Sequence, residues 1–540
     1  LRSLVESTSR VEILKGKWSV MAIKLGALEA RLSDLSVPPE DPLSSELMSS
    51  ISATCSAASS LAAVCRSAAP PGGKLKTQND LDSLSAKLDA HVNDLDVLIK
   101  TGLLSEDASA SPATATASGK TEAVRDEARN LMTRLQIGST ESRSSALDSL
   151  LGLLQENDKN IMIAVAQGIV PILVRLLDSS FSYEIKEKTV TAIAKISTLD
   201  SNKHALLEEG LILLNDLMRV LESGSIFAKE KSCSALIVLS TSRENARAIG
   251  SRGGISSLLE ICQEGTPNSQ ALAAGVLRNL AVFEEIKDNF LEENAVSTLI
   301  GLCNSGNSLA QENSIGCLAN LISGDDDLKL LVINEGGIEC VKNFWDSSVN
   351  PQSLEVAVHM VATLALLSPA IAESLVANGF LTRLLTLLNS SFLEVRIGAA
   401  ETLCELSNTP RQRRELGEMG CIPLLLNMLD GKSVEEKNSS TKLLSILMNC
   451  SGNRRIFRKQ EKGIVSVVKL LDPSLPNLDC RHSVRILSSL HHRKTCRKQM
   501  ISAGLCTHLQ RLADSDVNVD GAKKLNDSLR HNRAWRVIFG

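Results

Sequence analysis

The stretch Gly168-Ile169-Val170-Pro171-Ile172-Leu173 recurs in varied form along most of this chain. Each copy has a small residue, an aliphatic residue, two further positions and a leucine-rich turn, as in Gly420-Cys421-Ile422-Pro423-Leu424-Leu425. The nine anchor positions are 168, 210, 254, 295, 337, 379, 420, 463 and 504, so successive copies lie 41 to 44 residues apart. Repetition at about forty residues is typical of helical solenoids, whose units contact only their neighbours and form a long concave surface. We therefore expect recognition and not catalysis.

The bulk composition agrees with an elongated array. The chain has 540 residues, more than one compact core usually serves, and 43% of them are hydrophobic against 22% charged. Aromatic residues make up only 2% of the sequence. Thin layers of Leu, Ile, Val and Ala between short helices would explain this low aromatic content.

Charge is distributed unevenly along the chain. Residues 451–540 contain 18 Lys and Arg against 7 Asp and Glu, a balance of +11, so a net charge of −4 leaves −15 for residues 1–450. The last repeats are therefore basic on an acidic molecule. An acidic peptide, an anionic membrane surface or RNA could each bind such an end, whereas we expect no DNA partner.

Cysteine and histidine usage indicates neither disulfides nor a metal. The thirteen cysteines are an odd number spread singly, which favours free thiols in a reducing compartment, cytoplasmic or nuclear. Seven Cys and His residues lie between positions 480 and 508, but their spacing fits no structural zinc pattern. The uncharged run 356–372 is too short to span a bilayer. We expect no metal, no cofactor and no transmembrane helix.

Three regions of the chain differ in amino-acid composition and in the spacing of their apolar residues. Residues 1–104 have apolar residues at helical spacing, punctuated by Pro38-Pro39 and Pro70-Pro71-Gly72-Gly73, and we predict a bundle of about four helices. Residues 105–121 are dominated by Ser, Thr and Ala, which predicts a flexible linker. Residues 122–540 form the repeat array of about nine units, with atypical first and last repeats.

Each repeat can be read as three helices, and the third of these carries a family signature. The segment Ser269–Ala281 ends in Ala274-Gly275-Val276-Leu277-Arg278-Asn279-Leu280-Ala281, and a similar ending recurs at Gly316-Cys317-Leu318-Ala319-Asn320-Leu321. These segments closely resemble the armadillo repeat, with its Ala-x-x-x-Leu-x-Asn-Leu-Ala pattern. The resemblance covers roughly residues 124–535 and implies an all-α, right-handed armadillo superhelix.

The order of helical domain, linker and armadillo array resembles plant U-box/armadillo proteins and their relatives that lack the U-box. A U-box needs about seventy residues between the bundle and the repeats, whereas only residues 105–121 are available there. Ubiquitin-ligase activity is therefore not carried over. No Ser, Cys or carboxylate lies in a recognisable catalytic motif, and we expect no enzyme.

The resemblance also implies where a partner binds, because the third helices of armadillo repeats line the concave groove. The groove asparagine of the family, which clamps a peptide backbone, corresponds to Asn279, Asn320 and Asn449 here, while other repeats place Lys195, Val238, Leu366, Glu405 and Ser489 there. The tryptophan found four residues earlier in nuclear-import receptors is replaced by Gly275, Gly316 and Ser445. We add Arg396, Glu405, Arg481 and Arg485 as charged groove residues.

These observations predict a non-enzymatic adaptor or scaffold that holds an extended or helical segment of a partner protein in the groove. An acidic segment is one form that this partner could take. One alternative is a peripheral membrane scaffold that docks through the basic C-terminal repeats. Another is an accessory role in a ubiquitin-ligase pathway. The simpler alternatives are that the asparagines satisfy neighbouring backbone groups and that the arginines only keep a surface soluble.

Overall fold

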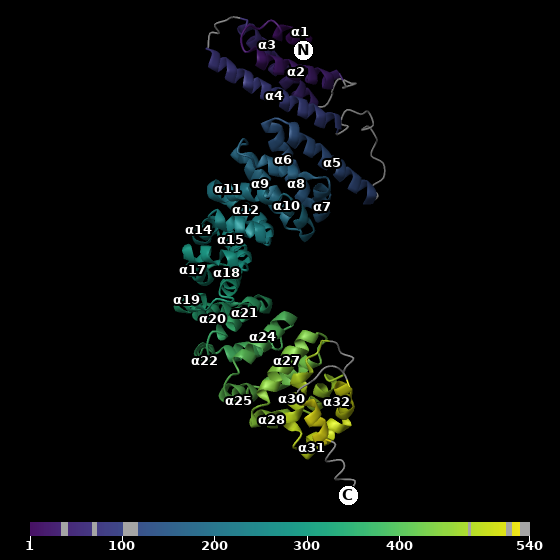
Figure 1. The fold of residues 1–540 in the computed structure, drawn as a ribbon, viewed down its shortest axis with the longest axis vertical. Helices are drawn as coiled ribbons and strands as arrows, with labels where there is room; N and C mark the ends of the chain where they lie inside the picture. Colours follow the sequence, from purple (N-terminus) through teal and green to yellow (C-terminus); the bar gives the residue numbers. More distant parts are fainter. Residues whose placement is uncertain (34–41, 67–72, 101–116, 473–476, 515–520, 530–540) are drawn as a thin grey trace. The chain divides into compact units, whose positions relative to one another are not determined.

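The described parts of the chain consist of helices joined by turns and short loops. The computed structural model describes residues 1–33, 42–66, 73–100, 117–472, 477–514 and 521–529 (Figure 1). No strand occurs in these ranges, which confirms the all-α prediction. The contacts divide the chain into two compact units, Leu1–Ala248 and Ile249–Gly540.

The first unit begins with four helices, α1 (Arg2–Thr8), α2 (Lys15–Ser33), α3 (Pro42–Val64) and α4 (Lys74–Lys100). Their core centres on the fully buried residues Trp18, Met21, Leu25, Leu81 and Leu88. Three ion pairs join α2 to α4 at seven-residue spacing: Lys17–Asp82 at 2.6 Å, Lys24–Asp89 at 2.5 Å and Arg31–Asp96 at 3.0 Å. Because both partners advance in the same direction, α2 and α4 run parallel, as an up-down-up bundle requires.

One helix of the bundle meets the length and hydropathy criteria for a transmembrane helix, although none was expected from the sequence. The 18-residue segment Leu47–Val64 of α3 is long and apolar enough to cross a bilayer, with a mean hydropathy of 1.3. Two bent helix pairs, Asp158–Ala166 with Ile169–Leu176 and Pro369–Ala377 with Phe380–Leu387, meet the same criteria only if each pair counts as one span. The Ser- and Ala-rich segment of α3 is longer than the run 356–372 and likewise carries no charge, so the expectation of no transmembrane helix overlooked it.

The repeats follow from residue 117. Two helices, α5 (Ala117–Ile137) and α6 (Thr140–Glu156), form an incomplete first repeat. In the first unit, complete repeats follow as α7 (Asp158–Ala166), α8 (Ile169–Leu176) and α9 (Tyr183–Ser197), then α10 (Lys203–Glu208), α11 (Gly210–Ser223) and α12 (Ile226–Leu239). We refer to the members of each triplet as the first, second and third helix. Helix α13 (Arg243–Ser251) lies at the boundary between the two units.

The second unit continues this order. It begins with α14 (Gly254–Glu264) and α15 (Pro267–Leu280), and the next three repeats are α16 (Lys287–Glu292), α17 (Ala295–Ser305) and α18 (Ser308–Leu321); α19 (Asp326–Asn334), α20 (Gly337–Ser347) and α21 (Leu354–Ala365); and α22 (Pro369–Ala377), α23 (Phe380–Leu387) and α24 (Leu393–Glu405). Two further repeats follow as α25 (Pro410–Glu418), α26 (Cys421–Leu429) and α27 (Val434–Leu447), then α28 (Ser451–Phe457), α29 (Gly463–Lys469) and α30 (Cys480–Leu490). The last helices are α31 (Lys494–Ser502) and α32 (Leu505–Asp514). Short 3₁₀ turns at Asp200–Asn202, Glu284–Ile286 and Pro351–Ser353 precede α10, α16 and α21.

The repeated small residue marks the sharp turn between the first and second helix. Gly168 has φ of 87° and Gly420 has φ of 89°, in the left-handed region that costs glycine little. Asn294 takes the same place before α17 with φ of 52°, as asparagine tolerates this region better than other residues. The forty-residue period of the sequence is therefore the period of this turn.

The third helices stack on one another within each unit. Contacts join α6 to α9 and α9 to α12 in the first unit, and successive third helices from α15 to α30 in the second. This stacking makes the repeats of each unit an α-solenoid of armadillo type. The predicted linker 105–121 lies outside the described residues up to position 116, whereas Ala117–Thr121 already belong to α5, so the helix begins earlier than expected. The domain boundaries as a whole remain a prediction.

Candidate partner-binding surface

The candidate surface is the side of the second unit formed by its third helices, α15, α18, α21, α24, α27 and α30. Asn279 and Asn320 occupy the same register in the neighbouring helices α15 and α18, and both are half-buried. The Asn320 side chain donates from Nδ2 to the backbone oxygen of Arg278 at 3.0 Å. The structure thus places two of the three predicted asparagines at the same register of adjacent helices, and the Asn320 amide is bonded to the backbone of the preceding repeat.

Arg278 fills the space beside Gly316, where import receptors have an indole. A Cβ atom at Gly316 would lie 2.6 Å from Nε and 2.8 Å from Cδ of Arg278, so only glycine admits the guanidinium in this position. Asn313 holds the same helix pair from the buried side, because its Nδ2 donates to the backbone oxygen of Ala271 at 2.9 Å. Sequence reasoning noted the glycine and missed the arginine that replaces the ring.

His359 on α21 continues this surface. Its side chain is exposed to solvent, yet desolvation by surrounding protein lowers the pKa of the imidazole, and the positive charge of Arg278 lowers it further against the opposing effect of Glu355. Leu366, which corresponds to the family asparagine in this repeat, is 64% exposed and adds an apolar position.

The C-terminal part of the surface is less basic than predicted. Arg481 binds the carboxylate of Asp479 through Nε at 2.9 Å and Nη2 at 2.7 Å, so its charge is offset locally. This hydrogen bonding is the main reason that the pKa of Asp479 is lowered. Arg485 is exposed one helical turn further on. Glu405 approaches Lys442 of the next third helix at 3.7 Å.

Asn449 is exposed but lies two residues beyond the end of α27 at Leu447. It therefore presents its amide from a turn and not from the helix, unlike Asn279 and Asn320.

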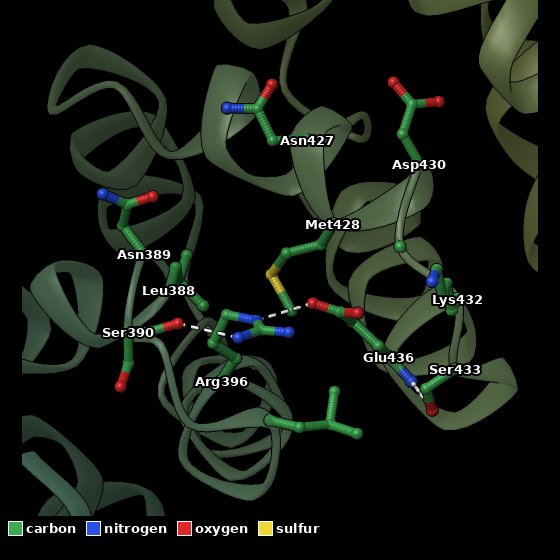
Figure 2. A pocket seen from close by; sticks show the side chains of 12 residues that line it. Leu388, Asn389, Ser390, Arg396, Asn427, Met428, Asp430, Lys432, Ser433 and Glu436 are labelled. Carbon is green, nitrogen blue, oxygen red and sulfur yellow. Dashed lines mark hydrogen bonds and ion pairs between the residues drawn. The ribbon is translucent and has the colours of Figure 1, made fainter.

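Arg396 lies elsewhere. Its Nε binds Oε1 of Glu436 at 2.6 Å and its Nη1 donates to the backbone oxygen of Ser390 at 2.7 Å, as Figure 2 shows. The pair lines a cavity of about 490 Å³ between the loops that precede α24 and α27, with Asn427 and Lys432 on its rim. Because nine residues at 100° per residue place Arg396 and Glu405 on opposite sides of α24, the two predicted groove residues are not brought together.

No metal site accompanies this surface in the part of the chain that the structure describes, where no three His, Cys, Asp or Glu side chains gather around a common point. All thirteen cysteines are free thiols.

Comparison with known families agrees with this architecture. A family model described as the armadillo/beta-catenin-like repeat matches residues 157–198, which span α7 to α9. The chain therefore contains armadillo repeats. A second model, described as a domain of unknown function (DUF7032), matches residues 1–103 of this armadillo protein.

Its relatives include several plant proteins. U-box domain-containing protein 8 of Arabidopsis thaliana is 24% identical over 278 residues, which cover 51% of this chain and 72% of the relative. U-box domain-containing protein 12 of the same plant is 32% identical over 109 residues, 20% of this chain and 16% of the relative. Junction plakoglobin of Xenopus laevis is 21% identical over 309 residues, 56% of this chain and 41% of the relative.

A crystal structure of an engineered protein matches the fold with a TM-score of 0.60 and 21% identity, and the match covers 75% of this chain and 97% of the engineered one. This likeness shows the fold, whereas the armadillo model and the Arabidopsis relatives confirm the relationship to plant U-box/armadillo proteins. Armadillo repeats generally mediate interactions between proteins.

Proposed function

We propose that this armadillo protein is a scaffold that holds a segment of a partner protein along the third helices of its second unit. The observation that carries the proposal is the strip formed by Asn279, Asn320, Arg278 and His359, which combines amide, guanidinium and imidazole groups on three successive helices. Leu366 extends this strip with an apolar contact. Such a mixture suits a peptide, which offers backbone amides and carbonyls together with side chains of several kinds.

A peptide display experiment tests the proposal directly. Peptides selected from a random library on the whole chain would be synthesised with a fluorescent label, and their affinity measured by anisotropy. We expect Asn279→Ala with Asn320→Ala, and separately His359→Ala with Leu366→Ala, to weaken binding at least tenfold, a loss of about 1.4 kcal/mol. The second pair is included because Asn320 also donates a structural hydrogen bond, whose loss costs about 1 kcal/mol of stability.

A matched control replaces two exposed amides outside the third helices, Asn304→Ala with Asn389→Ala. This variant should bind the peptides as the wild type does, and circular dichroism should show unchanged helicity in all three. Selected peptides that bind the His359/Leu366 variant at full strength would contradict the proposed surface.

The proposal includes a cytoplasmic or nuclear location. It is supported by the thirteen free thiols, nine of them buried, which an oxidising compartment would expose to disulfide formation during folding. Imaging of a fluorescent fusion in plant cells tests this location, and a secreted or vacuolar signal would contradict it.

A further inference from the structure

A row of basic residues runs along the first helices of the last three repeats, away from the third helices discussed above. Helices α25, α28 and α31 each carry two adjacent basic residues at the same register, 41 and 43 residues apart: Arg413-Arg414, Arg454-Arg455 and Arg497-Lys498. Helix α25 contacts α28. Figure 1 shows α25, α28 and α31 following one another along one edge of the second unit.

The first member of each pair has a structural role. Arg413 donates from Nη1 to the backbone oxygen of Ser407 at 3.1 Å, Arg454 from Nη1 to that of Met448 at 2.8 Å, and Arg497 from Nε to that of His491 at 3.2 Å. Each bond satisfies a carbonyl at the end of the preceding third helix, where a positive charge also suits the helix dipole. All three side chains are half-buried, as this role requires.

The second member of each pair has no such role. Arg414, Arg455 and Lys498, which we name the basic row, are all exposed, and no carboxylate in the described part of the chain forms an ion pair with them. In the earlier repeats the same position holds Met162, His204, Arg247, Asp288, Leu330 and Glu373. Among the earlier repeats only Arg247 supplies a Lys or Arg at this position, so a run of three consecutive cations occurs in the last three repeats alone.

The surroundings of the basic row favour a protein segment over a continuous polyanion. Further exposed cations flank it, namely Arg411, Arg458, Lys459, Arg493 and Lys494, but exposed carboxylates lie on the same edge at Glu415, Glu418 and Glu461. A membrane or a nucleic acid presents negative charge along its whole surface, so these glutamates would repel it. A peptide can place its carboxylates opposite the cations alone.

The repeat spacing sets the pattern of such a segment. Packed helices lie roughly 8–10 Å apart, and an extended chain advances about 3.3 Å per residue. Helices α25 and α28 are in contact, and α31 contacts α29 of the same repeat as α28. Acidic residues three apart in an extended segment therefore match the spacing from Arg414 to Arg455, and Lys498 continues the row in the next repeat. We propose that Arg414, Arg455 and Lys498 bind an acidic segment of a partner protein, with carboxylates at every third residue, independently of the third-helix surface.

The test uses the whole chain and two labelled nonapeptides of equal composition, one with aspartates at positions 2, 5 and 8 and one with the three aspartates adjacent. The spaced peptide should bind at least fivefold more tightly than the clustered one. Reversal of the row, Arg414→Glu with Arg455→Glu and Lys498→Glu, should weaken its binding at least tenfold. The control reverses three exposed lysines elsewhere in the second unit, Lys432→Glu with Lys469→Glu and Lys523→Glu, and so changes the net charge equally; its affinity should fall less than threefold.

Cys450 provides a local readout in the wild-type protein. Burial opposes ionisation of its thiol, but the N–H groups of Asn453 and Gly452 and the guanidinium of Arg414 outweigh this effect and lower the pKa. A peptide carboxylate on Arg414 weakens that last contribution, so the spaced peptide should slow alkylation of Cys450 by iodoacetamide at least threefold.

Three outcomes would overturn the proposal. They are equal binding by the row and control variants, equal binding of both peptides, and row-dependent binding to phosphatidylserine vesicles or single-stranded RNA without binding of the spaced peptide. The third-helix variants described above should bind the spaced peptide normally, so failure of this surface is distinguishable from failure of the other.

Discussion

Single residues set how closely neighbouring helices approach in this chain. Asn453 is fully buried and donates from Nδ2 to the backbone oxygens of Arg413 at 2.6 Å and Leu447 at 3.0 Å, which ties α28 to α25 and α27. Gly417 on α25 lies directly against this amide, because a Cβ atom there would overlap Oδ1 of Asn453. The glycine is therefore required by its neighbour and not by its own backbone.

Substitution of this pair should give a strongly non-additive result. Gly417→Ala alone should cost about 1–3 kcal/mol through overpacking, and Asn453→Ala alone about 2 kcal/mol through loss of two buried bonds. The double variant should be no less stable than Asn453→Ala, since the new methyl group then occupies vacated space. Thermal melting checks this, with Gly301→Ala as the control, because nothing lies within 4 Å of a Cβ atom there and the change should be neutral or stabilising. Additive losses would show that Gly417 is needed for another reason.

The sequence predicts on which helix and at which register a residue lies better than it predicts the contacts of that residue. Asn279 and Asn320 were placed correctly on adjacent third helices because the armadillo pattern fixes their register. The contact between Arg278 and Gly316 spans two repeats, and the bond between Arg481 and Asp479 depends on where α30 begins. Neither depends on helix periodicity, so no pattern in one sequence reports it.

At the scale of elements, helix α4 meets α6 of the first repeat through a carboxylate that is partly removed from water. Burial raises the pKa of Asp94 on α4 to about 6, against the opposing effect of Arg143 on α6. Arg143 is held in place by its bonds to the backbone oxygens of Leu135 at 3.0 Å and Gln136 at 2.8 Å, and it lies over the ring of Phe181 at 5.3 Å. A raised carboxyl pKa means that the folded state favours the protonated form.

The stability of this contact should therefore depend on pH in a defined window. The contribution of Asp94 is largest below its unfolded pKa of 3.8 and is lost as pH rises to about 6, where the desolvated carboxylate is charged. Asp94→Asn should melt at the wild-type temperature at pH 4 and at a higher temperature at pH 7. Asp80→Asn, at an exposed position of the same helix, should leave the wild-type difference between the two pH values unchanged. An Asp94→Asn variant with no gain at pH 7 would contradict this account.

Elements themselves followed closely from the sequence, because aliphatic spacing recurs in each repeat and a left-handed residue stands at every described turn between first and second helix except that before α29, where Lys462 has φ of −88°. The errors lie at element ends. Helix α5 begins at Ala117 inside the predicted linker, and α27 ends at Leu447 before Asn449. Ser and Thr favour helix N-caps, and residues 105–116 hold several of them, so the sequence offers several possible starts for α5 and singles out none. Assigned helix ends also vary by one or two residues with the capping geometry.

The whole molecule combines a helical bundle with a repeat array. The sequence predicts a domain boundary near residue 104, but the division into compact units does not fall there. The first compact unit joins the bundle to the first repeats. However, all but one of the fifteen buried residues of the bundle core lie between Leu4 and Leu95, and the exception is Ile137 of α5. A core that takes almost nothing from the repeats can lose its packing while the repeats keep theirs.

We therefore expect the bundle to unfold separately from the armadillo repeats. Cys65 in the bundle and Cys233 in α12 are both fully buried, so each is protected from alkylation until its own region opens. In a urea series with brief alkylation and mass spectrometry of the peptides, Cys65 should become modified at lower urea than Cys233, because a domain of about 100 residues buries a smaller fraction of its surface than a longer array. Cys317 of α18 reports the second unit in the same samples. Modification of Cys65 and Cys233 at the same urea concentration would mean that the contacts of Ile137 and Asp94 couple bundle and repeats into one cooperative structure, and the boundary near residue 104 would then separate sequence textures but not folding units.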